Sequence, residues 1–125
     1  MENSLPAFRR AVEGGFGIEA DVRLTRDGKL VVFHDETLAR LARKEGKDGE
    51  RLEVPGRVSD YSFEEIKSFF LLNGSERIPS LDELLKEVSG KVPLIIEIKE
   101  ERINNEICSL TDKILSGLRD RKSVV

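Results

Sequence analysis

Apolar residues near the N-terminus recur at helical spacing. Leu5, Phe8 and Val12 fall on one face of a helix, which we expect to begin at or just before Leu5. Gly14 and Gly15 follow the last apolar residue, and glycine is the usual residue just beyond a helix C-terminus. The pattern therefore predicts a first helix that ends at this glycine pair.

Two strand-like segments come next, residues 17–25 and 30–34. Between them lies Arg26-Asp27-Gly28-Lys29, and Asp-Gly between two such segments is a strong hairpin signal. The connection is too short for a parallel crossover, so the two strands are predicted to be antiparallel.

Residues 37–62 are rich in charge, and we expect them to be irregular and least ordered around 44–51. Two Ser-x-x-Glu capping boxes follow, Ser62 with Glu65 and Ser80 with Glu83. Each predicts the start of a helix, and the second helix should end near Gly90.

The apolar run 92–99 is typical of a strand buried on both faces. A helical apolar stripe then covers 103–118, and 121–125 resemble the opening of a further strand. This alternation predicts an α/β fold with parallel core strands, in which residues 1–125 form a single partial domain.

Composition narrows the class of protein. With 125 residues, 38% hydrophobic and 36% charged, the chain suits a globular domain, and its net charge of -3 with no tryptophan argues against nucleic-acid binding. Its apolar runs are too short for a membrane span, and no apolar leader follows Met1. One cysteine excludes an internal disulfide, which favours a cytoplasmic location.

Candidate chemistry lies on the predicted strands. Glu19 and Asp21 are two residues apart, which places both carboxylates on one face of a strand. If the hairpin loop is Asp27-Gly28, Asp21 pairs with His34, the single histidine of the chain, at a Cβ separation of ~5 Å. A loop one residue longer would turn His34 to the other face.

Glu97 and Lys99 repeat this spacing on the later apolar strand. A carboxylate within such a strand is costly unless it is paired or binds a metal. Glu19, Asp21 and Glu97 together would offer hard oxygen ligands to Mg²⁺ or Ca²⁺. The cation could neutralise a phosphodiester oxygen while His34 transfers protons near neutral pH.

Simpler interpretations compete with this one. Glu19 and Asp21 could be the solvent face of a strand, and a lone histidine is more often a surface residue than a catalytic one. Glu97 and Lys99 could form an ordinary ion pair. Because the predicted strand register places all of these residues near one another, we give the functional interpretation the same weight as the simpler ones.

Longer motifs carry a family resemblance. There are two long motifs, Gly17-Ile18-Glu19-Ala20-Asp21-Val22-Arg23-Leu24-Thr25-Arg26-Asp27-Gly28 and Val31-Val32-Phe33-His34-Asp35-Glu36-Thr37-Leu38. There are also four short ones, Glu2-Asn3-Ser4-Leu5, Gly56-Arg57-Val58-Ser59-Asp60, Ile78-Pro79-Ser80-Leu81 and Ile96-Glu97-Ile98-Lys99. Together these motifs resemble the glycerophosphodiester phosphodiesterase family. The resemblance spans residues 2–99. It implies a partial TIM (β/α)₈ barrel of the phospholipase C-like phosphodiesterase type, which hydrolyses glycerophosphodiesters to glycerol 3-phosphate and an alcohol.

The resemblance also implies residue roles. Glu19, Asp21 and Glu97 match the family's metal-binding carboxylates, His34 matches one of two catalytic histidines, and Lys99 matches a lysine near the phosphate. The family's first strand, which ends in His-Arg-Gly, has no counterpart after Met1, and Ala39 to Lys44 do not reproduce its Arg-Thr-Thr-Asn stretch.

Expectations for the chain on its own follow from these departures. A barrel of this type needs ~250 residues, so we expect a fragment that turns over little substrate and self-associates through exposed strand edges. Two alternatives stay open: a non-catalytic metal-binding or assembly module that pairs with another chain, and a different barrel phosphodiesterase related to phospholipase D-like toxins.

Overall fold

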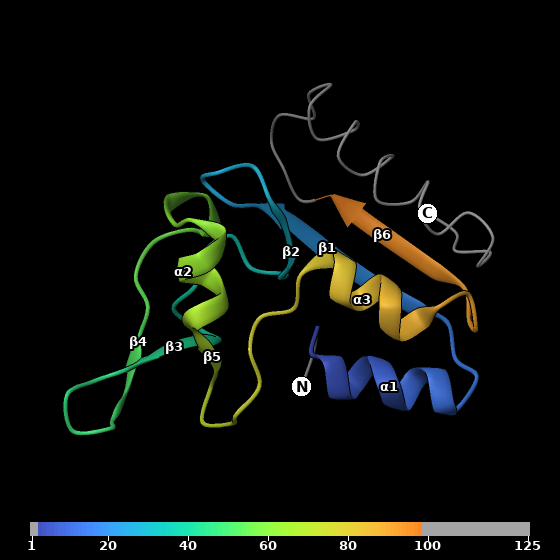
Figure 1. Ribbon diagram of the computed structural model, residues 1–125, viewed down its shortest axis with the longest axis horizontal. Helices are drawn as coiled ribbons and strands as arrows, with labels where there is room; N and C mark the ends of the chain where they lie inside the picture. Colours follow the sequence, from blue (N-terminus) through green and yellow to red (C-terminus); the bar gives the residue numbers. More distant parts are fainter. Residues whose placement is uncertain (1–2, 99–125) are drawn as a thin grey trace.

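Two three-stranded sheets organise residues 3–98, the part of the chain that the computed structural model describes (Figure 1). The helices are α1 (Leu5–Glu13), α2 (Phe63–Ser68) and α3 (Leu81–Val88), with a 3₁₀ turn η1 at Val58–Asp60, and the strands are β1 (Ile18–Leu24), β2 (Leu30–Val32), β3 (Ala42–Glu45), β4 (Arg51–Glu53), β5 (Phe70–Leu71) and β6 (Leu94–Ile98). The predicted helix at 103–118, the predicted strand at 121–125 and Lys99 lie outside the described residues.

The helix starts follow local sequence. Ser4 caps α1 by accepting a hydrogen bond from the Ala7 amide, and α1 ends at Gly14 as expected. Both predicted capping boxes are present, and in each the serine accepts from the glutamate amide while the glutamate accepts from the serine amide. These reciprocal bonds satisfy amides that have no partner inside the helix, so the caps define where α2 and α3 begin.

The first sheet has the order β2-β1-β6. β1 is antiparallel to β2 and parallel to β6, which confirms the predicted hairpin and the predicted parallel pair. In Figure 1, α3 crosses in front of β1 and α1 lies beside it, so both helices cover the same face of this sheet. The core between them contains the following buried side chains: Phe8, Ile18, Ala20, Val22, Leu30, Val32, Leu81, Leu84, Leu85, Val88, Val92, Leu94 and Ile96.

The expectation of an irregular 37–62 segment was wrong in part. β3 and β4 form an antiparallel hairpin within it, and β5 pairs with β3 to complete the second sheet, β4-β3-β5. The guanidinium of Arg43 donates to the carbonyls of Ala39 and Ala42, so a β3 side chain holds the backbone of a segment whose composition suggests a loop. The turn between β3 and β4 passes through Gly49, whose φ of 77° favours glycine.

A second apolar cluster supports that sheet. Its buried members are Val31, Phe33, Leu38, Leu41, Ala42, Val54, Val58, Ile66, Phe69, Leu71 and Ile78. Leu30 and Val32 of β2 belong to the first cluster, whereas Val31 and Phe33 belong to the second. β2 therefore joins the two cores through its alternating side chains.

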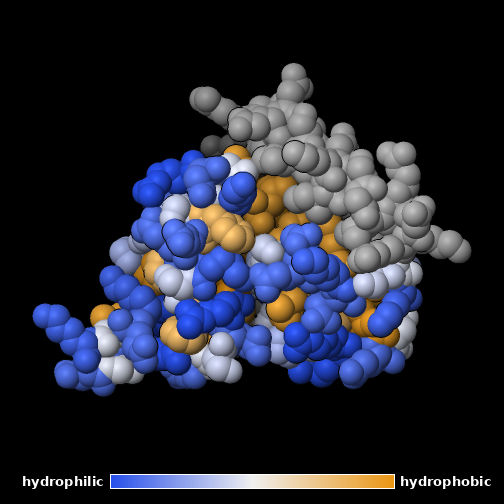
Figure 2. Space-filling model, in the orientation of Figure 1, coloured by the Kyte–Doolittle hydropathy of each residue, from blue (hydrophilic) through white to orange (hydrophobic). Residues whose placement is uncertain are grey.

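The distribution of hydrophilic residues on the surface is consistent with two buried apolar clusters. On the face shown in Figure 2, hydrophilic residues cover most of the described surface, and hydrophobic ones are visible in patches between them. Among residues 3–98, none of the helices has the length and apolar character needed to cross a bilayer.

Candidate functional site

The face of the first sheet that α1 and α3 leave uncovered carries the predicted site residues. Along β1, Ile18, Ala20 and Val22 are buried, whereas Glu19 is exposed and Asp21 is half-buried. Because side chains alternate along a strand, these carboxylates point away from the helices.

β6 follows the same rule, and here one prediction needs correction. Leu94 and Ile96 are buried, but Glu97 is exposed and Ile95 is 55% exposed. The strand is therefore buried on one face and not on two. Its other face continues the open surface of β1, which is why Glu97 shares a side of the sheet with Glu19 and Asp21.

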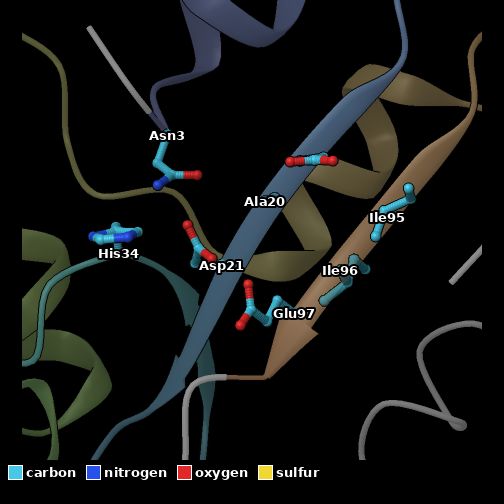
Figure 3. Close-up of a pocket in the computed structure, with 8 residues that line it drawn as sticks. Asn3, Ala20, Asp21, His34, Ile95, Ile96 and Glu97 are labelled. Carbon is cyan, nitrogen blue, oxygen red and sulfur yellow. The ribbon is translucent and has the colours of Figure 1, made fainter.

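A pocket of about 570 Å³ lies on this open face (Figure 3). It is lined by Asn3, Glu19, Ala20, Asp21, His34, Ile95, Ile96 and Glu97. In Figure 3 the carboxylates of Asp21 and Glu97 lie near each other on the same side of the sheet, and His34 lies on the far side of Asp21 from Glu97. The structure thus brings four of the five predicted site residues to one pocket. The fifth, Lys99, follows β6 and lies beyond the described part of the chain.

Asp21 and Glu97 are register partners on neighbouring parallel strands. Like charges at such positions destabilise a sheet. A cation bound between them would remove this repulsion, and carboxylate oxygens are the ligands that Mg²⁺ and Ca²⁺ prefer. The donor set therefore fits a hard divalent cation.

The three carboxylates line one pocket, but their side chains do not form a metal-binding geometry. Among residues 3–98, no three carboxylate, histidine or cysteine side chains stand in a geometry that would hold an ion as they are. Glu19 is exposed, and exposed side chains change rotamer within nanoseconds. Binding of an ion by all three carboxylates would therefore require their side chains to change rotamer.

The predicted pairing of Asp21 with His34 was wrong by one residue. The observed register pairs Val22 with Val32, and the Phe33 amide donates to the Asp21 carbonyl at 2.9 Å, so Asp21 is opposite Phe33. The loop is one residue longer than expected because Gly28, at φ 82°, follows the turn in the left-handed conformation before the chain rejoins the strand.

His34 nevertheless reaches the pocket. β2 ends at Val32, so the alternation of side chains along the strand does not determine which way His34 points. The prediction that a longer loop would turn His34 to the other face was therefore wrong, since His34 lines the pocket. Arg23 donates to the His34 carbonyl from Nε at 3.2 Å and from Nη2 at 2.7 Å, which fixes the backbone where the strand has ended.

Sequence reasoning missed Asp35 and Arg40. Asp35 is only 15% exposed at its side chain and lies 3.0 Å from His34 Nδ1 through Oδ1. Arg40 donates to both of its oxygens, at 2.7 and 2.8 Å. Hydrogen bonding by Arg40, with a smaller contribution from His34, holds the pKa of Asp35 at about 2 against the opposing effect of desolvation. The His-Asp dipeptide was the available signal.

Asn3 was missed as well. It lines the pocket, and its φ of 51° is unusual for a residue other than glycine. In Figure 3 its side chain lies above Asp21, on the side of the pocket where His34 also lies. The Glu2-Asn3-Ser4-Leu5 motif, in which Asn3 directly precedes the α1 cap, was the available signal.

Relatives match nearly the whole chain. A sequence model of the glycerophosphoryl diester phosphodiesterase family matches residues 1–123. A glycerophosphodiester phosphodiesterase of Caldanaerobacter subterraneus subsp. tengcongensis is 43% identical over 106 residues, which are 78% of this chain and 40% of that protein.

Solved structures agree with the sequence match. The glycerophosphodiester phosphodiesterase of Thermotoga maritima superposes with a TM-score of 0.69 and 36% identity, over 94% of this chain and 44% of its own. An Oleispira antarctica phosphodiesterase, solved with its product sn-glycerol-3-phosphate, gives a TM-score of 0.75 at 27% identity, over 92% of this chain and 46% of its own. The chain spans less than half the length of these relatives, and it belongs to the glycerophosphoryl diester phosphodiesterase family.

Proposed function

We propose that residues 1–125 form part of a single (β/α)₈-barrel domain of the phospholipase C-like phosphodiesterase type. The complete domain hydrolyses a glycerophosphodiester to glycerol 3-phosphate and an alcohol. The open face of the β2-β1-β6 sheet is the interior of this barrel, which explains why Ile95 is 55% exposed in the described residues. Barrel enzymes place their sites at the carboxyl ends of parallel strands, where Glu97 lies on β6.

One observation carries this proposal: Glu19, Asp21, Glu97 and His34 line a single pocket. Separate strands and a loop supply them, so local sequence alone does not force the convergence. The product bound to the Oleispira antarctica relative is sn-glycerol-3-phosphate, which supports a glycerophosphodiester as the substrate.

Glu19, Asp21 and Glu97 would hold the divalent cation, Mg²⁺ or Ca²⁺. When bound, such a cation neutralises charge on a phosphodiester oxygen and lowers the pKa of a coordinated hydroxyl group. Lys99, two residues after Glu97 in the sequence, would offset the remaining phosphate charge.

His34 would take one of the two proton transfers of the reaction. Hydrolysis adds water across one P–O bond, so a proton must leave the nucleophile and another must reach the departing alcohol oxygen. Histidine performs either transfer near neutral pH. The family resemblance implies a second histidine for the other transfer, and these 125 residues contain only His34.

A chimera tests the activity. Residues 3–98 would replace the matching segment of the Thermotoga maritima relative, and release of glycerol 3-phosphate from glycerophosphocholine would be followed with Mg²⁺ or Ca²⁺. We expect turnover by the chimera and a loss of at least about a hundredfold in its Glu97→Gln variant. Equal rates for the chimera and Glu97→Gln would refute the assignment of the site.

The 125-residue chain itself should show negligible turnover, because it lacks the second histidine that the family pattern contains. Rapid hydrolysis of glycerophosphocholine by the purified chain would contradict the shared role of two histidines.

A second candidate function is a non-catalytic assembly module that pairs with another chain. The exposed side chain of Ile95, on a sheet face that the helices within residues 3–98 leave uncovered, favours it. Turnover by the chimera separates the two functions, and size-exclusion chromatography of the purified chain tests whether this face pairs with a second copy. Self-association that Ile95→Lys abolishes would support pairing through this face, whereas a monomer in both forms would exclude self-pairing through it.

A further inference from the structure

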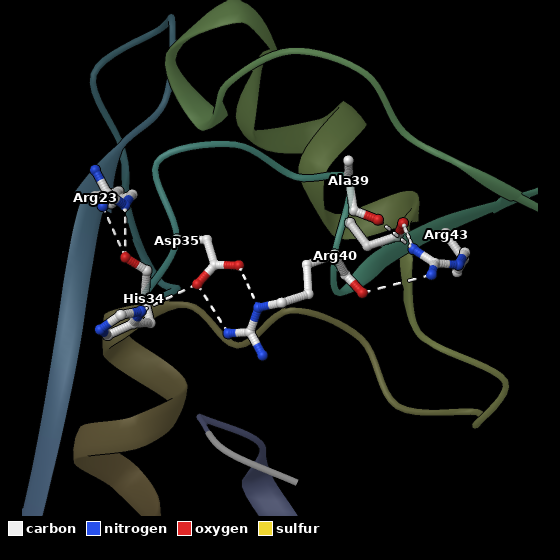
Figure 4. A network of polar contacts seen from close by, with 7 residues as sticks. Arg23, His34, Asp35, Ala39, Arg40 and Arg43 are labelled. Atoms are coloured by element: carbon white, nitrogen blue, oxygen red, sulfur yellow. Dashed lines mark hydrogen bonds and ion pairs between the residues drawn. The ribbon is translucent and has the colours of Figure 1, made fainter.

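A chain of polar contacts leads from Arg40 through Asp35 to the imidazole of His34 (Figure 4). Arg40 binds Asp35 with two parallel bonds, the arrangement that fixes a carboxylate most firmly. Asp35 Oδ1 accepts from Arg40 Nη2 and also lies 3.0 Å from His34 Nδ1. One carboxylate oxygen therefore joins the guanidinium to the imidazole.

The contact determines which imidazole nitrogen carries the hydrogen. With a pKa of about 2, Asp35 is ionised at any pH at which the chain would function, and an ionised carboxylate only accepts hydrogen bonds. His34 Nδ1 must therefore donate. In the neutral imidazole this leaves Nε2 without a hydrogen and able to take a proton.

The backbone of His34 is held independently. Arg23 contacts the His34 carbonyl through two nitrogens, as Figure 4 also shows. The side-chain contact with Asp35 and the backbone contact with Arg23 together restrain both the ring and the chain that carries it. The ring is still 52% exposed, so packing alone does not fix it.

We propose that Asp35 and Arg40 are positioning residues, which hold His34 in the tautomer with hydrogen on Nδ1 and present Nε2 to the pocket. The importance of this tautomer for turnover rests on the function proposed above. The contacts from which the tautomer is inferred, Arg40 with Asp35 and Asp35 with His34, lie within residues 3–98.

The single histidine makes the test direct, because every imidazole signal in a ¹⁵N-labelled sample belongs to His34. Long-range ¹H–¹⁵N spectra above the pH at which the ring titrates report which nitrogen carries hydrogen. We expect the Nδ1–H form in the 125-residue chain and a shift to the Nε2–H form in Asp35→Ala. An unchanged tautomer in a folded Asp35→Ala variant would overturn the proposal.

Arg40 supplies a second variant that keeps the carboxylate. Arg40→Gln should reduce the Nδ1–H population by less than Asp35→Ala, and Arg40→Lys should restore part of it, since lysine keeps the charge but not the two parallel bonds. If Asp35→Ala does not fold, an unchanged tautomer in Arg40→Gln refutes the proposal. Glu36→Gln is the matched control, because Glu36 forms a separate exposed ion pair with Arg57, and its tautomer should equal that of the parent chain.

Kinetics of the chimera add a second readout when kcat is normalised to the folded fraction of each variant. Asp35→Ala should lower kcat by roughly a hundredfold or more with KM within about threefold, as loss of an orienting carboxylate does elsewhere. Because the spectra require neither substrate nor cation, an inactive chimera with the expected tautomer contradicts the proposed function and supports the positioning contact. An active chimera whose Asp35→Ala variant keeps the parent's kcat contradicts the positioning role alone.

Discussion

The two faces of the β2-β1-β6 sheet differ in what their side chains contribute. Toward α1 and α3, β1 presents Ile18, Ala20 and Val22, all at most 5% exposed. Toward the open side, the same strand presents Glu19 and Asp21. One strand thus supplies both faces, because successive side chains alternate.

The comparison shows that alternate residues of one strand have different roles. One set of side chains packs in the core, and the other set lines the pocket. Burial of apolar side chains stabilises the covered face, at about 25 cal/mol per Å² removed from water. On the open face, the register partners Asp21 and Glu97 place two carboxylates side by side, which suits a cation but adds no apolar burial. Four experiments should measure how much the covered face, the pocket residues and the hairpin each contribute to the stability of the fold.

The largest effect should come from the covered face. Leu84 is fully buried between α3 and the sheet, so Leu84→Ala should lower the free energy of unfolding by about 2–5 kcal/mol through lost burial and a residual cavity. Urea unfolding measures it. Ile95→Ala on the open face is the comparison and should cost less than about 1 kcal/mol, because Ile95 is 55% exposed. Equal losses would show that the open face is covered in solution.

On the open face, the cation should have the next effect. A cation at a hundred times its Kd should raise the free energy of unfolding by about 2.7 kcal/mol, since it binds only the folded chain. Thermal unfolding with and without Mg²⁺ or Ca²⁺ measures this. Asp21→Asn should abolish the increase, while Glu53→Gln, an exposed carboxylate on β4, should retain it. The same increase in Asp21→Asn would argue against a site at Asp21.

Asp35 should make the stability depend on pH by about 1–2 kcal/mol. Its folded pKa of about 2 lies below the ordinary value of 3.8, so the folded state binds fewer protons. The stabilisation is complete above about pH 4 and is lost as pH falls toward 2. Arg40→Gln should therefore lower stability at pH 6 and converge with the parent chain near pH 2, as urea midpoints would show.

The exposed Glu36 with its Arg57 partner provides the control for that titration. Glu36→Gln should follow the same pH dependence as the parent chain, because exposed ion pairs contribute little. Parallel curves for Arg40→Gln and the parent chain would mean that the Asp35 contact does not persist in solution.

The smallest effect concerns the hairpin that leads to His34. Gly28 has a φ of 82°, so Gly28→Ala should destabilise by about 1 kcal/mol, and Gly28→Asn by less, since asparagine tolerates this conformation better. Gly74→Ala is the control, because an added Cβ there meets only ordinary contacts. Equal thermal midpoints for Gly28→Ala and the parent chain would refute this account of the loop.

Local sequence predicted much of the fold. The capping boxes placed the starts of α2 and α3, and the Asp-Gly turn placed the β1–β2 hairpin. Local sequence failed to predict β3 and β4. Their charge suggested a loop, but these two strands pair with each other, and β3 also pairs with β5 to form a sheet. It also failed by one residue in the β1–β2 register, since Asp-Gly is compatible with more than one loop length.

The sequence by itself determined which residues share a strand face, because alternation and capping act over a few neighbouring positions. Only the tertiary structure decided that Glu97 lies beside Asp21, that Phe33 and not His34 faces Asp21, and that Asp35 and Arg40 hold the imidazole. These arrangements depend on pairing between segments far apart in the chain and on where a strand ends, and both are set by the packing of the two cores.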